Sequence, residues 1–403
     1  MKILLAHPGT QHSYHLAREL ERLQLLGAFW TCLGFGENSV GAAVGHLLSS
    51  LSSLRGLNSR IVHGLPRKRM RIRPLPELSA LWHLRRGGDP VTLMHKRNAA
   101  FQEAVSNAAL AKCDAVIGFD TSSWQLAERC AKSGKVFYLD RTIAHPAVLD
   151  RLMLDFARKY PDWAGALAPR PACVVEAEKT EHVLAQRIVV GGSFARDTLV
   201  TEGISADRIV VNPYGVDWEK FSAPVTVPPN HPLRFLYAGS VTARKGVPVL
   251  LDAWRAFAPC DAELWIAGSI RAHERTLIPD LPGLRLLEQV SHAKMAEVYA
   301  NCDVFVLPSL FEGFGLVILE ALASGLPVIS TPHTGAIEAL TELTLGRIVP
   351  VASVDALVEA MRHYRDNPPR REVVAAVAVD ALRDRFSWKS YGDRWAALLH
   401  ETA

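Results

Sequence analysis

The sequence is poor in cysteine and has no cysteine pairs. Its 403 residues include six cysteines, and no two of them form a C-x-x-C motif. Zinc sites and disulfide frameworks in small proteins need such spacings, so we expect neither here. Reduced and mostly buried thiols are expected instead. The six residues are Cys32, Cys113, Cys130, Cys173, Cys260 and Cys302.

Long hydrophobic runs are also missing. No stretch of about 18 apolar residues exists to cross a bilayer, and the apolar run Ile3–Ala6 is followed at once by His7 and Pro8. This run predicts a first β-strand rather than a signal peptide. The net charge of +4 is too small to indicate nucleic-acid binding. We expect a cytoplasmic protein that binds no nucleic acid.

Short apolar runs alternate with helical patterns, and this alternation restarts in the second half. Such alternation is typical of parallel sheets covered by helices on both faces. We therefore predict an α/β fold with two Rossmann-like domains. Strands are expected at Ile3–Ala6, Ala115–Phe119, Val136–Leu139, Val189–Gly191, Leu233–Ala238, Leu264–Ala267 and Val304–Leu307, and helices at Ser13–Leu26 and Val247–Phe257.

A change in composition marks the boundary between the halves. Residues 223–232 hold four prolines in ten residues, which predicts a stiff, exposed linker. We expect domains at 1–222 and 223–385. Trp388, Tyr391, Trp395 and Leu399 stand at helical spacing and predict a last helix within 386–403.

A basic segment interrupts the first half. Residues 38–76 contain no Asp or Glu. Basic residues interleaved with Leu, Ile and Met suit an anionic membrane surface, but a solvated basic loop has the same composition. Peripheral membrane contact through segment 55–73, at the inner face of the membrane, therefore stands beside the solvated loop as an alternative. The basic residues are Arg55, Arg60, Arg67, Lys68, Arg69, Arg71 and Arg73.

The segment that follows Val304–Leu307 carries the strongest chemical signal. Glu312 lies just after the carboxyl end of this expected strand, where ligands bind in open α/β sheets. Gly313 and Gly315 leave backbone N–H groups unobstructed at the start of the next helix, which suits a phosphate. Glu320 lies inside that helix among apolar residues, so its charge needs a partner.

A second loop brings two adjacent cations to the same edge of the sheet. Gly239 and Ser240 follow the strand Leu233–Ala238, and Arg244 and Lys245 precede the next helix. Fixed cations at this place would stabilise a departing diphosphate. The loop is no P-loop, because G-x-x-x-x-G-K-[ST] is absent.

Together these segments resemble the retaining GT-B glycosyltransferases of family 4, also called glycosyl transferases group 1. The resemblance rests on the Glu-x7-Glu spacing from Glu312 to Glu320, on Lys245, and on Val211–Asp217, which resembles the end of the family's first domain. It implies two Rossmann-like domains facing a central cleft. It also implies an acceptor-binding domain at 1–222, a nucleotide-sugar-binding domain at 223–385 and a last helix that crosses back to the first domain.

The resemblance also implies roles for the matching residues. Glu312 would contact the donor sugar, Glu320 the ribose, and Lys245 the phosphates. Gly239-Ser240 departs from the family's Gly-Arg pair, and Arg244 would supply the missing guanidinium. The backbone N–H groups that would face the diphosphate belong to the segment Gly313, Phe314, Gly315 and Leu316.

The first domain offers fewer candidates. Gly9 lies in the first strand–helix loop, where the resemblance places a glycine near the diphosphate; His7 and His12 are weaker candidates. Asp120 stands where many relatives carry a histidine. It would either orient or deprotonate the acceptor hydroxyl or cap a helix that begins near Ser122.

Ser193 and Glu338 lie in two further segments that resemble the family, and we expect both to have structural roles. Ser193 is interpreted as a helix cap near the cleft, and Glu338 as a structural or hinge-side residue.

The expected function is transfer of a sugar from a nucleoside-diphosphate sugar to a hydroxyl of a glycan or lipid-linked acceptor, in cell-surface polysaccharide or glycolipid synthesis. The resemblance implies retention of the anomeric configuration. No Asp-x-Asp motif occurs, so we expect no metal, and no cofactor. Hydrolysis or epimerisation of a nucleotide sugar, and a non-catalytic scaffold, remain alternatives. A dehydrogenase is disfavoured, because Gly34-Phe-Gly36 lacks the third glycine of G-x-G-x-x-G.

Overall fold

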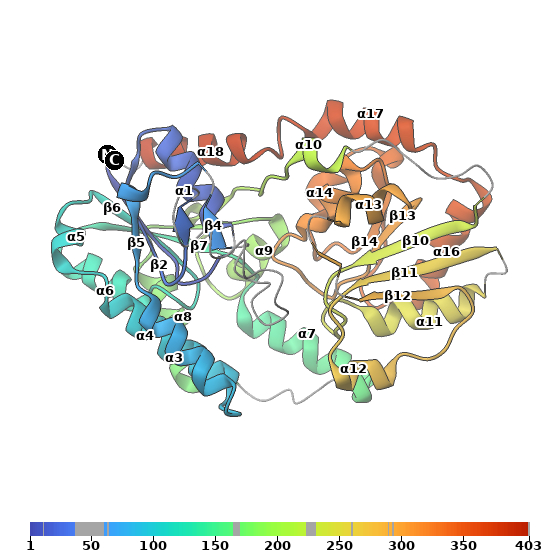
Figure 1. Cartoon of the computed structure of the whole chain (residues 1–403), viewed down its shortest axis with the longest axis horizontal. Coiled ribbons are helices and arrows are strands. Elements are labelled where there is room, and N and C mark those ends of the chain that lie inside the picture. The colour runs from blue at the N-terminus through green and yellow to red at the C-terminus, as the bar shows by residue number, and fades with distance from the viewer. Residues whose placement is uncertain are drawn as a thin grey trace.

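The computed structural model describes most of the chain as two α/β domains (Figure 1). The described residues are 1–10, 12–36, 60–62, 64–163, 170–222, 231–258, 261–288, 290–291 and 294–401. The predicted proline-rich linker lies almost wholly outside them, as do Arg55 and Cys260.

The first domain contains a seven-stranded parallel sheet in the order β5-β2-β1-β6-β7-β8-β9. Strands β1 and β6 are buried along their whole length, as expected for a parallel sheet covered on both faces. The strands are β1 (Ile3–Ala6), β2 (Leu26–Thr31), β5 (Met70–Ile72), β6 (Ala115–Phe119), β7 (Val136–Arg141), β8 (Arg187–Val190) and β9 (Ile209–Val211), beside a small pair of β3 (Phe35–Gly36) and β4 (Ile61–Val62).

Helices cover this sheet and connect its strands. They are α1 (Ser13–Arg22), α3 (Pro74–Leu84), α4 (Pro90–Glu103), α5 (Asn107–Ala111), α6 (Trp124–Lys132), α7 (Pro146–Lys159), α8 (Ala172–Leu184) and α9 (Ser193–Thr201), with 3-10 turns η2 (Arg67–Arg69), η3 (Pro161–Trp163) and η4 (Ala206–Arg208). The short helix α10 (Trp218–Phe221) comes next in the chain but packs against helices of the second domain.

The second domain repeats the plan with a six-stranded parallel sheet in the order β12-β11-β10-β13-β14-β15. Its strands are β10 (Leu233–Ala238), β11 (Ala262–Gly268), β12 (Leu284–Glu288), β13 (Val304–Leu307), β14 (Val328–Ser330) and β15 (Gly346–Ile348). Its helical elements are α11 (Val247–Phe257), α12 (Ala272–Leu277), α13 (Met295–Ala300), α14 (Leu316–Ala323), α15 (Ala336–Ala339), η5 (Leu343–Leu345), α16 (Val354–Asp366) and α17 (Arg371–Leu382).

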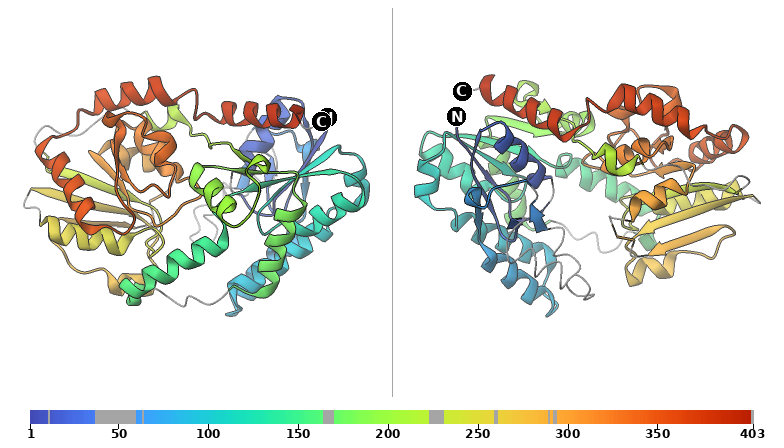
Figure 2. Two further views of the ribbon diagram at one scale, coloured as in Figure 1. Left: turned by 180° about the vertical axis from the view of Figure 1, so that it is seen from behind. Right: turned by 45° about the horizontal axis from the view of Figure 1, so that its top comes forward.

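The last helix, α18 (Trp388–Glu401), returns from the second domain and packs against α1 of the first. Figure 2 shows the two ends of the chain close together as a result. The hydroxyl of Tyr391 donates to Asp140 of β7 at 2.7 Å, and Trp395 is fully buried. The aromatic residues predicted on one face of this helix thus bind it to the first domain.

The predicted fold class is confirmed, but some boundaries were wrong. The first helix ends at Arg22 rather than Leu26, because Leu26 begins strand β2. Helix α6 begins at Trp124 rather than near Ser122. Seven of the strands in the described part of the chain were missed: β2, β3, β4, β5, β9, β12 and β15. Most are short or partly exposed edge strands, whose composition lacks the continuous apolar run of a central strand.

Two further observations concern the described part of the chain. No helix in it is both long enough and apolar enough to cross a membrane. Its cysteines are unpaired; Cys32, Cys113, Cys130 and Cys302 are buried, and Cys173 is exposed.

Candidate active site

Two loops of the second domain meet at the carboxyl edge of its sheet. Strands β10 and β13 are hydrogen-bonded neighbours, so the loops that follow them lie side by side. Gly246 adopts a left-handed conformation with φ of +71°, and a Cβ at this position would lie 1.9 Å from the carbonyl oxygen of Pro308. Glycine is therefore required where the two loops touch. The Leu310 N–H donates to the Arg244 carbonyl oxygen at 2.9 Å, which joins the loops.

The carboxylate of Glu312 binds both predicted cations. Lys245 Nζ donates to Glu312 Oε1 at 2.8 Å, and Arg244 Nη1 donates to Oε2 at 3.1 Å. The hydroxyl of Ser309 also donates to Oε1, at 3.1 Å. Two cations share one carboxylate, so this cluster keeps a formal charge of +1. Arg244 is one-third exposed, with 33% of its side chain accessible, and can receive a further anion.

The surroundings of Glu312 favour its ionised form. Burial by itself raises the pKa of this carboxyl, but Lys245 and Arg244 outweigh burial and hold the pKa below its ordinary value. Glu312 is therefore a carboxylate at neutral pH. It accepts hydrogen bonds rather than donating a proton.

The N-terminus of α14 lies beside this cluster. Gly315, with φ of +86°, is the residue before the helix, and Leu316 begins it. Phe314 is buried, and its carbonyl oxygen accepts from the N–H of Gly335 at 2.5 Å. In the other loop, a Cβ on Gly239 would lie 3.3 Å from Lys245 Cδ, so this glycine leaves room for the lysine side chain. Ser240 is half-buried in the same loop.

Glu320 has the partner that its position in an apolar helix requires. The hydroxyl of Tyr299, at the end of α13, donates to Glu320 Oε2 at 3.0 Å. Both residues are buried. Burial and the neighbouring Glu320 carboxylate raise the pKa of Tyr299 well above its ordinary value, so the phenol remains a donor. Tyr299 was not predicted, because no local motif connects it with a glutamate 21 residues later.

The first domain touches this site through Thr142. A Cβ on Gly313 would lie 1.9 Å from the carbonyl oxygen of Thr142, so the domains are in direct contact there. The N–H and hydroxyl of the same threonine donate to Asp120 Oδ1 at 3.1 and 2.8 Å. Asp120 is therefore held beside the second-domain loops. It does not cap α6; Asp120 accepts from Thr142 instead.

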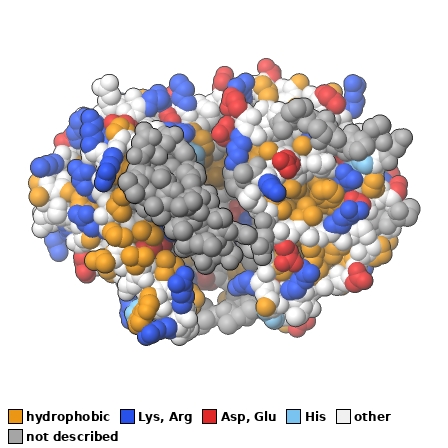
Figure 3. Space-filling view, in the orientation of Figure 1, with side chains coloured by type: hydrophobic (Ala, Val, Ile, Leu, Met, Phe, Trp, Pro, Cys, Tyr) orange, Lys and Arg blue, Asp and Glu red, His pale blue; other side chains and the backbone are white. Residues whose placement is uncertain are grey.

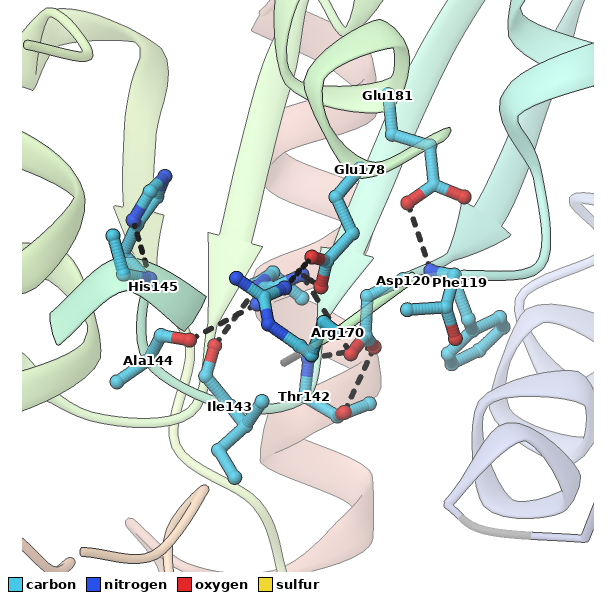
Figure 4. Close-up of polar contacts among 12 residues, drawn as sticks. Phe119, Asp120, Thr142, Ile143, Ala144, His145, Arg170, Glu178 and Glu181 are labelled. Carbon is cyan, nitrogen blue, oxygen red and sulfur yellow. Dashed lines mark hydrogen bonds and ion pairs between the residues drawn. The ribbon is translucent and has the colours of Figure 1, made fainter. Parts of the chain in front are cut away.

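Behind Asp120 lies a buried network of charges (Figure 4). Arg141 is 1% exposed; its Nη1 lies 3.8 Å from Asp120 Oδ2 and donates to Glu178 Oε1 at 3.1 Å. Arg170 binds the other oxygen of Glu178. Glu181 is fully buried and accepts from the N–H of Thr121 at 2.8 Å. Burial raises the pKa of Glu181 to about 8 despite this contact.

The two histidine candidates, in the loop between β1 and α1, have different partners. Gly9 donates its N–H to His7 Nδ1 at 3.0 Å. Burial lowers the pKa of His7 to about 4, so its ring is neutral at pH 7 and carries its proton on Nε2. His12 Nε2 lies 3.0 Å from Asp140 Oδ2, which also accepts from Tyr391 of α18. The carboxylate of Asp140 thus connects His12 with the returning helix, and the contact of His12 is structural.

Ser193 and Glu338 form a contact between the domains. Glu338 Oε1 accepts from both the N–H and the hydroxyl of Ser193, each at 2.6 Å. The interpretation of Ser193 as a helix cap was wrong, because Gly192 is the residue before α9 and the Ser193 side chain reaches across to Glu338 instead. Beside this pair, the rings of Phe194 and His333 stack at 4.0 Å.

Residues 232–367 match the family model described as "Glycosyl transferases group 1". The phosphatidyl-myo-inositol mannosyltransferase of Mycobacterium leprae is 34% identical over 152 residues, which are 36% of this chain and 40% of that protein. A GDP-mannose-dependent monoacylated alpha-(1-6)-phosphatidylinositol monomannoside mannosyltransferase of Corynebacterium glutamicum is 33% identical over 39% of this chain and 44% of its own length. The matched part of the chain thus spans less than half of either relative.

The similarity in structure extends over the whole chain. Sucrose-phosphate synthase of Thermosynechococcus elongatus superposes with a TM-score of 0.66 at 16% identity, covering 100% of this chain and 99% of the other. At that identity the likeness shows the fold. The protein therefore has the GT-B fold, and its similarity to the glycosyl transferases group 1 family model lies in residues 232–367.

Proposed function

We propose that this protein transfers a sugar from a nucleoside-diphosphate sugar to a hydroxyl group of a glycan or lipid-linked acceptor, with retention of the anomeric configuration. The observation that carries the proposal is the cluster of Lys245, Arg244 and Glu312. It lies at the N-terminus of α14 and beside the point where the first domain meets the second.

The cluster is suited to a diphosphate leaving group. When the glycosidic bond of the donor breaks, negative charge accumulates on the departing phosphate. Arg244 and Lys245 already lie in fixed positions, because Glu312 orients both. The backbone N–H groups at Gly315 and Leu316 would add the favourable end of the helix dipole. These groups would stabilise the leaving group without a metal ion.

The two glutamates suit the two rings of the donor. Glu312 is ionised and would accept hydrogen bonds from the transferred sugar. Glu320 lies in the following helix and would accept from the ribose hydroxyls. Tyr299 holds one of its oxygens, so the carboxylate reaches the nucleotide in a fixed orientation. Gly9 would allow the first loop of the other domain to approach the donor.

Asp120 would act on the acceptor. Its Oδ1 is held by Thr142 and its Oδ2 faces Arg141, so the carboxylate is positioned to orient an acceptor hydroxyl. For retention we propose front-face attack: the acceptor oxygen bonds to the anomeric carbon, the bond to the diphosphate breaks, and the acceptor's proton passes to a phosphate oxygen of the leaving group.

The relatives support glycolipid or cell-surface polysaccharide synthesis as the setting. Two of them are named for phosphatidylinositol acceptors, and one of these for GDP-mannose. We propose a lipid-linked acceptor for this chain as well, and a place in the cytoplasm at the inner face of the membrane.

A donor screen followed by variants tests the proposal. The protein is first mixed with UDP-, GDP- and ADP-sugars and candidate acceptors, and product is measured with and without acceptor. We expect acceptor-dependent transfer, and Lys245→Ala and Glu320→Ala should each reduce it by about 100-fold. Arg275→Ala is the matched control, because Arg275 forms an exposed ion pair with Glu288 in the same domain. The proposal would be refuted if the donor is hydrolysed at the same rate with and without acceptor, or if both variants transfer the sugar at a near-normal rate.

A further inference from the structure

Helix α3 carries an apolar stripe on the side that faces away from the protein. Leu75, Leu78 and Trp82 stand at helical spacing and have 77%, 50% and 50% of their surface exposed. On the opposite side of the helix, Glu77 and Ala80 are buried. Soluble proteins usually turn the apolar face of a helix inward, so this orientation is reversed. Figure 3 shows the orange apolar surface at the lower left, where Figure 1 places α3.

Ion pairs hold the helix in this orientation. Glu77 Oε1 accepts from Arg60 Nη2 and Oε2 accepts from Arg97 Nη1, each at 2.9 Å. Glu77 is 5% exposed, and a buried carboxylate separated from both arginines would be costly. The side of α3 that carries Glu77 therefore faces the interior of the domain, and the leucines and Trp82 on the other side are exposed to solvent.

Cations border the apolar stripe at both ends. The guanidinium of Arg86 lies 3.7 Å from the centre of the Trp82 ring. At the other end, a cavity of about 460 Å³ lies over the edge of the sheet. Among the described residues that line it, none is acidic and five are basic. They are Lys2, Arg69, Arg71, Arg73 and Lys112.

An apolar groove connects the cavity with the stripe. The groove has a volume of about 410 Å³ and lies between α3 and α4, with Leu75 and Ala100 on its walls. Arg73 lines both the groove and the basic cavity. A site for negative charge and a site for a hydrocarbon chain therefore adjoin each other at one arginine.

We propose that α3, the groove and the basic cavity form a docking site for anionic phospholipid at a bilayer surface. The phosphate of the lipid would lie among Arg71 and Arg73, and its acyl region would contact Leu75 and Leu78. Trp82 and Arg86 would lie at the level of the headgroups, where aromatic and basic side chains are favoured. The proposal rests on the membrane contact proposed above and names the surface that makes it.

The same observations favour a bilayer over a soluble polyanion. A polysaccharide or nucleic acid would satisfy the arginines but would leave the exposed leucines in water. Arg69 of the basic segment is already paired with Glu21, whereas Arg73 lines both the groove and the basic cavity. An amphiphile uses both parts of the surface.

Vesicle flotation tests the proposal without any donor or acceptor. The full chain is mixed with vesicles of phosphatidylcholine alone or of phosphatidylcholine with phosphatidylglycerol. We expect binding only to the anionic vesicles, and weaker binding at high salt. The double variant Leu75→Ser/Leu78→Ser should bind at least roughly tenfold more weakly, and Arg71→Gln/Arg86→Gln should also bind more weakly.

The matched control is Val183→Ser, which removes another exposed apolar side chain from the first domain, 72% exposed on α8. It should float as the wild type does. The proposal is overturned if the wild type does not bind anionic vesicles, if the leucine variant binds normally, or if a heparin column retains the protein while vesicles do not. Binding of nucleoside diphosphates, followed by thermal shift in the same variants, separates a failure here from a failure of the proposed transfer activity.

Discussion

The carbonyl oxygen of Thr142 lies so close to Gly313 that a Cβ there would be only 1.9 Å away. Thr142 belongs to the first domain and also holds Asp120, whereas Gly313 follows directly after Glu312. Thr142 thus contacts both Asp120, the carboxylate proposed to act on the acceptor, and the loop of the second domain proposed to bind the donor. The approach of the two domains depends on the absence of a side chain at residue 313.

Replacing Gly313 by alanine should therefore push the domains apart at the site. A displacement of about 1 Å can cost 100-fold in rate, so we expect transfer to fall by about that factor while the circular dichroism spectrum stays unchanged. Gly192→Ala is the control, since its Cβ would meet Glu338 at an ordinary contact distance of 3.4 Å. Equal activity of the two variants would show that this contact does not matter for catalysis.

The charge of Glu312 should contribute to stability at neutral pH. Its pKa is lowered in the folded protein, so the contribution is complete above the unfolded value of about 4.5 and is lost as the pH falls through the folded pKa. We expect Glu312→Gln to melt at a lower temperature than the wild type at pH 7, and the difference to shrink below pH 4.5. Differential scanning calorimetry over this range measures it, and a constant difference would contradict the explanation.

Tyr299 should act as a positioning residue for Glu320. Tyr299→Phe removes the 3.0 Å hydrogen bond to Oε2 and leaves the ring in place. A hydrogen bond to a charged group contributes about 1.5–3 kcal/mol, and we expect part of this to appear as a rise of about tenfold in KM for the donor, with kcat little changed. Tyr364→Phe provides a control at another mostly buried tyrosine in the same domain. A fall in kcat alone would argue against this role.

The contact between Glu338 and Ser193 should favour approach of the domains. Glu338→Gln weakens two charge-assisted hydrogen bonds of 2.6 Å, and the closed arrangement should become less favourable by roughly 1–3 kcal/mol. Small-angle scattering should then show a larger radius of gyration, and kcat/KM should fall. Glu342→Gln, at an exposed position of the same domain, should change neither quantity. A normal radius in Glu338→Gln would show that other contacts hold the domains together.

The sequence alone determined the parts of this protein that depend on local patterns. Strands β10 and β13 and helix α11 lie where they were predicted. Buried strands and amphipathic helices can be recognised in the sequence because their apolar residues follow a continuous or a helical pattern. The neighbourhood of Glu312 with Lys245 also followed from the sequence, since parallel strands bring their following loops to one edge of the sheet.

Only the tertiary structure decided which distant residues meet. Thr142 lies against Gly313, Tyr299 reaches Glu320, and Ser193 binds Glu338, although no spacing in the sequence connects the members of any pair. The outward stripe of α3 has the same origin. Periodicity shows that a helix has an apolar side, but the ion pairs of Glu77 with Arg60 and Arg97 decide that this side faces the solvent.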